Sequence, residues 1–179
     1  MLDCLETSAR IIAVFPVPAG HFTYAVPFNV AGQHTLAATS VSRLGTSFAN
    51  VAELIAAVTS LRGFIVDGAA YNNTPANSIT VEDGIAAKST GRTAIGGHSF
   101  STKVSLRTQE PNENLSPWMD SLADAPYFDL FLLDEDNTLF FVRGSRSATK
   151  IEYNQVLPHS TSTEIEVEIA SVNGFQKIA

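Results

Sequence analysis

The stretch that most constrains this chain is Tyr127–Arg143, YFDLFLLDEDNTLFFVR. Tyr127–Leu133 is apolar apart from one aspartate, Asp134–Asn137 supplies four polar turn residues, and Leu139–Val142 resumes the apolar run. Short runs rich in aromatic residues and bounded by turn residues are typical of strands. Because apolar residues fall on both faces of each strand, both faces are expected to be covered. The sequence therefore predicts a hairpin at the middle of the main sheet.

Composition favours one self-sufficient domain over residues 1–179. A chain of 179 residues with 45% apolar residues can bury a sizeable core without covalent staples. Cys4 is the single cysteine, so no intramolecular disulfide can form, which fits a reducing compartment. No apolar run approaches the roughly 20 residues of a membrane span, and Met1–Arg10 lacks the apolar region of a signal peptide. We therefore expect no membrane partner.

The net charge further limits the kinds of molecule that this protein is expected to bind. The formal net charge is −7, which disfavours binding to nucleic acid through neutralisation of phosphates. Only 16% of the residues are charged, below the roughly 25% that is usual for soluble domains. This low charged fraction indicates a protomer that covers part of its surface with partners.

Two segments are predicted to be helices. Asn50–Leu61 begins with an N-cap residue, has Glu53 three positions later, and repeats apolar residues at helical spacing. We expect Arg62 to complement the dipole at its C-terminus and Gly63 to provide a left-handed cap. Ser116 followed by Pro117 predicts the start of a second, two-turn helix over residues 117–123.

The rest of the chain predicts many short strands, which makes the expected fold mainly β (α+β): a β-sandwich or half-barrel with one or two flanking helices and a long loop. The predicted strands are Arg10–Phe15, stopped by Pro16 and Pro18; His21–Val30; weakly Gln33–Ser40; Phe64–Val66; Ile79–Val81, followed by a turn at Glu82–Gly84; His98–Arg107; Lys150–Tyr153; and Glu164–Val172. Residues 98–179 are expected to form the core sheet, and residues 1–83 to be an elaborated outer lobe.

The segment Gly84–Gly97, GIAAKSTGRTAIGG, is small, flexible and mildly basic in an acidic chain. This composition predicts a long exposed arm that becomes ordered on a neighbouring subunit. Lys88 and Arg92 would then meet acidic groups of that partner.

No catalytic, cofactor-binding or metal site is predicted, so we expect the protein not to be an enzyme. The four histidines show no metal-ligand spacing, and His98 lies outside any nucleophile-elbow pattern. Asp134, Asp136 and Asn137 imitate part of a calcium loop, but the later glycine and the distant glutamate are missing, so a solvated turn is expected. The glycines of Gly84–Gly97 form no phosphate-binding loop.

Three features in this order resemble bacteriophage virion proteins, and tail-tube subunits in particular. They are the Gly-rich arm before a strictly alternating strand (Gly84–Arg107), the short helix feeding the aromatic hairpin (SPWMDSLADAPYFDLFLLDEDNTLFFVRG), and the alternating C-terminal strand closing in Asn173-Gly174-Phe175. The segment ANVAELIAAVTSLRGFIVDG is similar to a helix-then-strand unit of such proteins. The resemblance implies sixfold rings whose sheets close into a tube, with a long loop reaching the next ring.

Under this resemblance the chain would be a virion component, assembled in the bacterial host cytoplasm, whose partners are itself and other virion proteins. No sequence-specific binding of nucleic acid is expected. Glu164, Glu166 and Glu168 share one face of a strand and would line the channel, where a negative wall lets DNA slide. A solvated outer face is the alternative for this row. A neck, capsid or decoration protein, or a monomeric β-sandwich binding module, are the alternatives for the whole chain.

Overall fold

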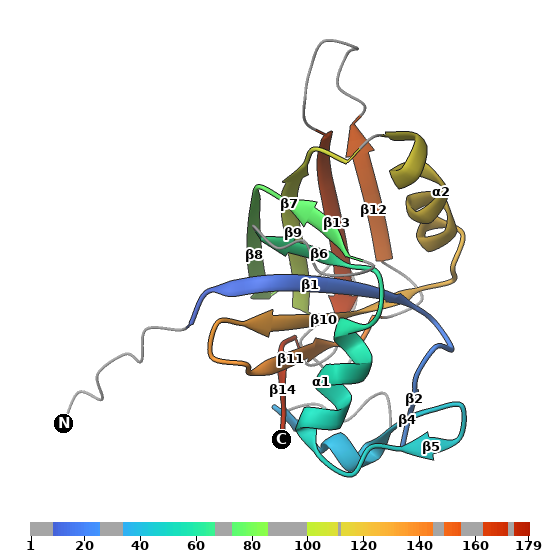
Figure 1. The fold of residues 1–179 in the computed structure, drawn as a ribbon, viewed down its shortest axis with the longest axis vertical. Coiled ribbons are helices and arrows are strands. Elements are labelled where there is room, and N and C mark those ends of the chain that lie inside the picture. Colours follow the sequence, from blue (N-terminus) through green and yellow to red (C-terminus); the bar gives the residue numbers. More distant parts are fainter. Residues whose placement is uncertain are drawn as a thin grey trace, which may run out of the picture.

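The computed structural model describes residues 9–25, 34–66, 73–85, 100–110, 112–144, 149–154, 163–171 and 174–179. Strands dominate, so the predicted mainly β class with two α-helices is confirmed (Figure 1). The α-helices are α1 (Val51–Thr59) and α2 (Asn112–Ala123), and a short 3-10 turn, η1, covers Ala38–Ser40.

The described strands form three sheets. The seven-stranded sheet has the order β3-β14-β11-β10-β1-β6-β7, the four-stranded sheet the order β12-β13-β9-β8, and the three-stranded sheet the order β2-β4-β5. Their bounds are β1 Ile11–Pro18, β2 Thr23–Tyr24, β3 Thr35–Leu36, β4 Val41–Arg43, β5 Thr46–Ser47, β6 Phe64–Val66, β7 Thr74–Ala76, β8 Ser78–Ile85, β9 Phe100–Thr108, β10 Phe128–Asp134, β11 Leu139–Val142, β12 Thr149–Asn154, β13 Thr163–Ser171 and β14 Gln176–Ile178.

The predicted hairpin is β10 and β11, and β10 is the central strand of the seven-stranded sheet. Every residue of β10 is buried, as expected for a strand covered on both faces. Asp134 is buried too, and its Oδ1 accepts hydrogen bonds from the N–H groups of Asp136 at 3.0 Å and Thr138 at 2.7 Å. The prediction of a solvated turn was therefore wrong for Asp134, which holds the turn from inside.

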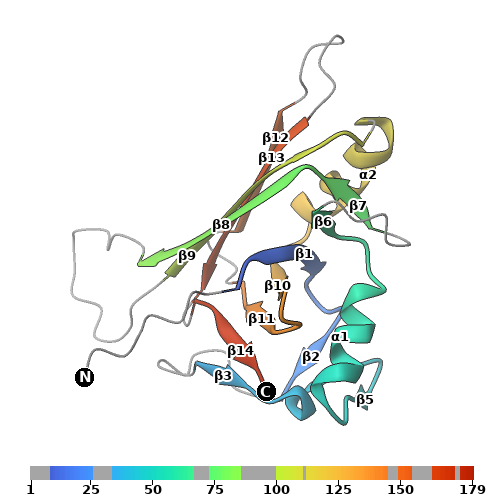
Figure 2. The same ribbon diagram turned by 60° about the vertical axis from the view of Figure 1, so that its left-hand side comes forward.

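Alternate residues of β10 pack into two separate hydrophobic clusters. The molecule is therefore layered, with one cluster on each side of β10. Leu130 and Leu132 belong to a cluster between the seven-stranded sheet, the four-stranded sheet and α2, whereas Phe131 and Leu133 belong to a cluster shared with α1 and the three-stranded sheet. Figure 2 shows these layers, with the four-stranded sheet on one side of β1 and β10 and with α1 on the other.

The prolines of β1 do not end the strand, contrary to the prediction. β1 pairs with β10 over its whole length, up to Pro18 opposite Phe128. On its other side it pairs with β6 only at Ala13 and Val14. A proline cannot donate to a ladder, so Pro16 is tolerated where one side of the strand has no partner.

Helix α1 begins as predicted, because Asn50 Oδ1 accepts a hydrogen bond from the N–H of Glu53 at 2.9 Å. The predicted left-handed cap at Gly63 was wrong, since Gly63 does not have a positive φ and the helix ends at Thr59 with Ser60 as its C-cap. Gly63 is needed for space instead: a Cβ there would lie 2.3 Å from Phe15 Cδ1 and 2.7 Å from Val14 O.

Helix α2 begins at Asn112, earlier than predicted, and Pro117 lies inside it. Leu115, Met119 and Leu122 are fully buried at helical spacing and anchor this helix in the core under the four-stranded sheet. Their burial outweighs the backbone hydrogen bond that Pro117 cannot make.

The four-stranded sheet contains the alternating strands β9 and β13, which confirms both predictions. Its edge strand β8 is longer than predicted, because Glu82 pairs with Lys103 and Gly84 with Ser101 in the ladder to β9. The expected turn at Glu82–Gly84 was therefore wrong, and cross-strand pairing overrides the local turn propensity.

The first 83 residues contribute β1, β3, β6 and β7 to the seven-stranded sheet and β8 to the four-stranded sheet. β1 lies directly beside the central strand β10. In the described structure these residues are thus part of both sheets of the core, and the sheet of residues 98–179 is completed by them. Val26–Val30 of the predicted second strand lies outside the described residues.

The contact at Gly63 generates a stability prediction. Gly63→Ala forces Phe15 and the backbone at Val14 to move, so we expect a loss of about 2 kcal/mol in the free energy of unfolding. Urea denaturation measures it. Gly20→Ala is the control: it meets no atom within 4 Å but has a φ of +88°, so it should lose about 1 kcal/mol through backbone strain alone. A Gly63→Ala variant as stable as the wild type contradicts the packing argument.

Candidate functional site: the outer face of the four-stranded sheet

The four-stranded sheet has one apolar and one polar face. Val104, Leu106, Ile165, Val167 and Ile169 are buried against the core. The alternate residues of β8, β9 and β13 point the other way and form what we call the outer face. Its described side chains are Ser78, Thr80, Glu82, Ser101, Lys103, Ser105, Arg107, Glu164, Glu166 and Glu168.

The three predicted glutamates all lie on this outer face, and each has a partner on β9. Glu164 pairs with Arg107, and Glu166 Oε1 lies 2.9 Å from Lys103 Nζ. Glu168 Oε1 accepts a hydrogen bond from Ser101 Oγ at 2.8 Å. Three carboxylates in a row on one strand repel one another, and these cross-strand partners offset that repulsion.

The two ion pairs contribute little to the stability of the sheet. The Lys103 and Glu166 side chains are 43% and 38% exposed, and exposed pairs contribute little to folding. Hydrogen bonding and attraction from the Glu166 carboxylate raise the pKa of Lys103 above its ordinary value. The described outer face carries four carboxylates, including Glu82, against the two cations Lys103 and Arg107, and is net acidic.

The second notable feature of the four-stranded sheet is its pair of edge strands. In the described part of the chain, β8 and β12 are the edge strands, and no strand pairs with their outer sides. The three steps of the sheet are all antiparallel, so β8 and β12 run in opposite directions.

A groove of about 330 Å³ between β8, β9 and β13 is lined by Thr80, Ser105 and Glu166 among others.

The predicted arm joins the described ends of β8 and β9, at Ile85 and Phe100. Lys88 and Arg92 lie outside the described residues. The described ladder between these two strands ends at the pair Ile85 and Phe100, and Gly84 and Ile85 of the predicted arm belong to it.

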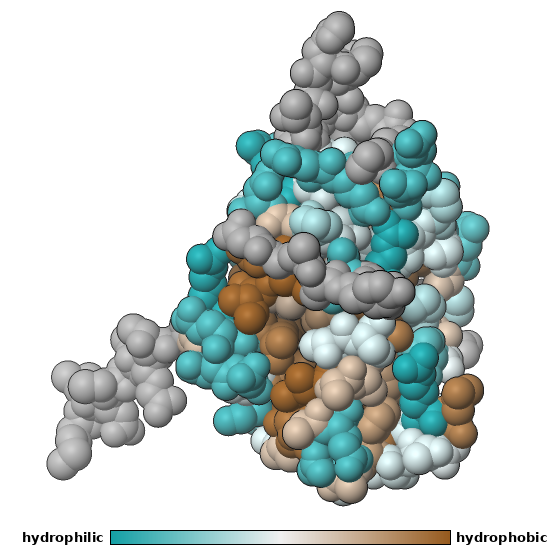
Figure 3. Space-filling view, in the orientation of Figure 1, coloured by the Kyte–Doolittle hydropathy of each residue, from teal (hydrophilic) through white to brown (hydrophobic). Residues whose placement is uncertain are grey.

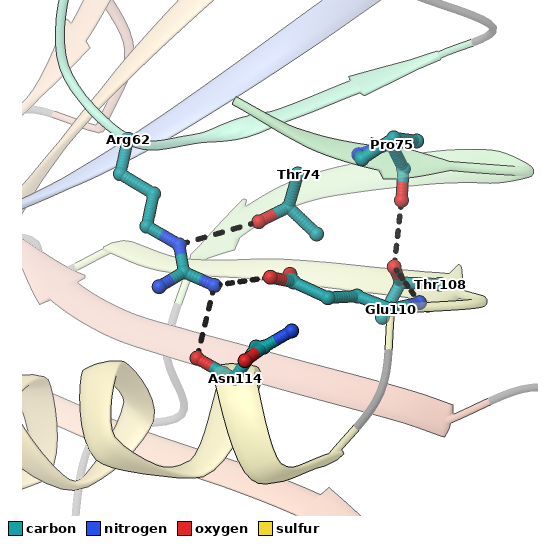
Figure 4. A network of polar contacts seen from close by, with 6 residues as sticks. All are labelled: Arg62, Thr74, Pro75, Thr108, Glu110 and Asn114. Carbon is teal, nitrogen blue, oxygen red and sulfur yellow. Dashed lines mark hydrogen bonds and ion pairs between the residues drawn. The ribbon is translucent and has the colours of Figure 1, made fainter. Parts of the chain in front are cut away.

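A second polar cluster lies at the opposite end of this ladder and was missed from the sequence (Figure 4). Arg62 Nη2 lies 2.6 Å from Glu110 Oε1 and donates to the carbonyl of Asn114 at 3.1 Å. The Arg62 guanidinium also stacks on the Trp118 ring, 4.6 Å from its centroid. This cluster ties the end of α1 to the start of α2 through the Arg62 side chain.

A cleft of about 510 Å³ opens beside this cluster, lined by Ser60, Leu61, Arg62, Asn73, Thr74 and Glu110. Glu110 Oε2 and Asn73 Oδ1 are buried and accept no hydrogen bond from the residues that the structure describes. No local sequence pattern predicts this cluster, because Arg62 and Glu110 are 48 positions apart.

A buried carboxyl group lies in the other core layer. Asp129 is 3% exposed; its Oδ2 accepts from the Tyr24 hydroxyl at 3.0 Å and its Oδ1 from the Gly144 N–H at 3.0 Å. Burial raises the pKa of Asp129 to about 6, although both hydrogen bonds and Arg143 oppose the shift. The carboxyl is therefore close to its titration point at neutral pH.

The described residues bring no catalytic constellation together. No group of three or more histidine, cysteine, aspartate or glutamate side chains suited to a metal ion occurs among them. His34 is exposed, while His21 has a buried Nε2 without a hydrogen-bond partner, and burial lowers the pKa of His21. His98 and His159 lie outside the described residues.

Comparisons with known proteins give no relative: no protein-family model, no curated protein and no solved structure matches this chain. Neither helix in the described part of the chain has the length and apolar character that crossing a membrane requires.

Asp129 generates a pH prediction. Its folded pKa of about 6 exceeds the ordinary 3.8, so the folded state binds the proton more tightly and this contribution to stability falls as pH rises between those values. Relative to Asp129→Asn, the wild type should gain about 2 kcal/mol in the free energy of unfolding when the pH drops from 7 to 4.5. Urea denaturation at both pH values measures this gain. Asp124→Asn, at an exposed position, is the control, and its free energy of unfolding should change between the two pH values as that of the wild type does. An Asp129→Asn variant that shows the same change as the wild type contradicts the prediction.

Proposed function

We propose that this chain is a structural subunit of a phage particle, resembling a tail-tube subunit, that assembles into rings through the edges of its four-stranded sheet. The rings enclose a channel for DNA and stack into a tube. The protein acts by self-assembly, with other virion proteins as further partners, and performs no catalysis.

The observation that carries this proposal is a sheet with one buried face, one polar face and two edge strands, β8 and β12, that pair with no further strand among the described residues. When two copies are related by rotation about a ring axis, β8 of one copy lies beside β12 of the next. Because these strands run in opposite directions, they meet antiparallel, as every other pair in the sheet does. An even number of strands thus lets the sheet continue around a closed ring without a break in its ladder, which also removes the exposed edges.

In such a ring the outer face of each sheet becomes the channel wall. Glu164, Glu166 and Glu168 then face the lumen, each beside its β9 partner. The excess of carboxylates over cations keeps the wall negative, so passing DNA gains nothing from counterion release. The serine and threonine residues of β8 and β9 keep the remaining wall polar and neutral.

The direct test is the oligomeric state. Purified protein should form rings or tubes in negative-stain micrographs, and sedimentation should show association that increases with concentration. A protein that remains monomeric at all concentrations up to the millimolar range overturns the proposal and favours a monomeric binding module. Particles with a closed shell and no channel favour the capsid alternative.

The arm generates a prediction about stacking. Lys88→Glu with Arg92→Glu reverses the two charges that we expect to meet acidic groups on the next ring. Rings should still form, because the edges of the four-stranded sheet are unchanged, but tubes should be lost. Electron microscopy counts rings and tubes. Lys177→Glu, an exposed charge reversal on β14, is the control and should leave tubes intact. Wild-type tubes in the double variant contradict the role of the arm.

The channel wall generates a prediction about DNA. Glu166→Lys with Glu168→Lys should still assemble at moderate salt but should retain linear DNA, with affinity that falls steeply as salt rises. Covalently closed circular DNA cannot thread a preformed tube, so retention confined to linear DNA places the new lysines in the lumen. The exchange Lys103→Glu with Glu166→Lys preserves the ion pair and the charge of the wall, and should retain neither form. Equal binding of circular and linear DNA by the lysine variant contradicts the lumen assignment.

A further inference from the structure

The hairpin that joins β4 to β5 has a residue that its geometry disfavours. Leu44 and Gly45 form the two-residue connection, with φ values of +51° and +80°. Two successive positive φ values are typical of the type I′ turn, for which asparagine followed by glycine is the preferred pair. Gly45 fits this turn, whereas leucine is a bulky side chain in a backbone region that such residues rarely adopt.

Nothing in the described protomer offsets this strain. Leu44 is 95% exposed and is the only large hydrophobic residue exposed among the residues that the structure describes. The space around the neighbouring Gly45 is open, since a Cβ built there meets no atom within 4 Å. A single exposed leucine is ordinary on a protein surface, but one held in a strained backbone at a hairpin tip needs a reason.

The hairpin presents Leu44 on a well-anchored support. Val41, at the start of β4, is fully buried in the core beneath α1. The Phe48 N–H donates to the Val41 carbonyl at 3.3 Å, and the hydroxyl groups of Thr23 and Ser42 lie 2.6 Å apart. A rigid support lowers the entropy that is lost when an exposed side chain docks.

We propose that Leu44 is an apolar anchor that inserts into a second copy of this chain. The proposal rests on the self-assembly proposed above and adds a contact that the edges of the four-stranded sheet do not provide. Its recipient is the apolar surface beside α1, where brown side chains gather over β1 and along the helix (Figure 3). Val51, Ile55 and Ile65 are partly exposed apolar residues of α1 and β6 that pack on the core there.

Anchor and recipient are different parts of the protomer, so the contact between copies is heterologous. A heterologous contact generates either a closed ring or an open filament, and both agree with a tube built from one chain. An isologous contact between two Leu44 hairpins would instead stop at a dimer. The geometry of the anchor therefore favours the same class of assembly as the open edges of the sheet.

Leu44→Asn separates the anchor from the fold, because asparagine suits this turn better than leucine does. The variant should have a melting temperature equal to or above that of the wild type under conditions where both are monomeric. Its self-association, measured by sedimentation, should weaken at least tenfold. Thr46→Asn, at an exposed position of the same hairpin, is the matched control and should associate like the wild type.

The recipient is located by cross-linking. Leu44→Cys in a Cys4→Ser background, labelled with an apolar photo-reactive maleimide, should cross-link to peptides spanning residues 51–66 of another copy. Cross-links to other regions overturn the assigned recipient, and wild-type association by Leu44→Asn overturns the anchor. A wild-type protein that never associates overturns the proposed function together with the anchor, so the failures are distinguishable.

Discussion

The complete burial of β10 is the constraint on which the rest of the structure depends. A strand buried on both faces must place apolar side chains on each, and a layer must cover each side. In this chain Leu130 and Leu132 are covered by the four-stranded sheet and α2, and Phe131 by α1 and its neighbours. The only polar residues that β10 brings into this interior, Asp129 and Asp134, both have hydrogen-bond partners. The two layers therefore exist because one strand has no polar face.

The packing around β10 covers one face of the four-stranded sheet and leaves the other face polar and directed away from the core. Its inner residues complete one core, whereas the described outer residues form cross-strand pairs, of which the two ion pairs are exposed and add little stability. The pairing of Lys103 and Arg107 with glutamates keeps this face close to balance, with a modest negative excess.

Local signals in the sequence predicted the elements whose causes are local. The cap at Asn50, the alternation of β9 and β13 and the turn after β10 all depend on neighbours in the chain. Features set by distant residues were missed or misplaced: the role of Gly63 depends on Phe15, and the length of β8 depends on β9. The Arg62–Glu110 pair and the parallel pairing of β3 with β14 have no local signature at all. The outer-face glutamates were predicted from alternation, but their β9 partners required the register between two strands.

The position of β1 has a consequence for the timing of folding. β1 is synthesised well before β10, yet it pairs along its whole length with that strand, about 120 residues later. At about 5–20 residues per second, a ribosome needs roughly 6–24 s to supply that partner. Until then neither core layer can close, and β13, which pairs with β9 to complete the four-stranded sheet, is made later still. The four-stranded sheet of a nascent chain therefore stays incomplete until β13 has left the ribosome.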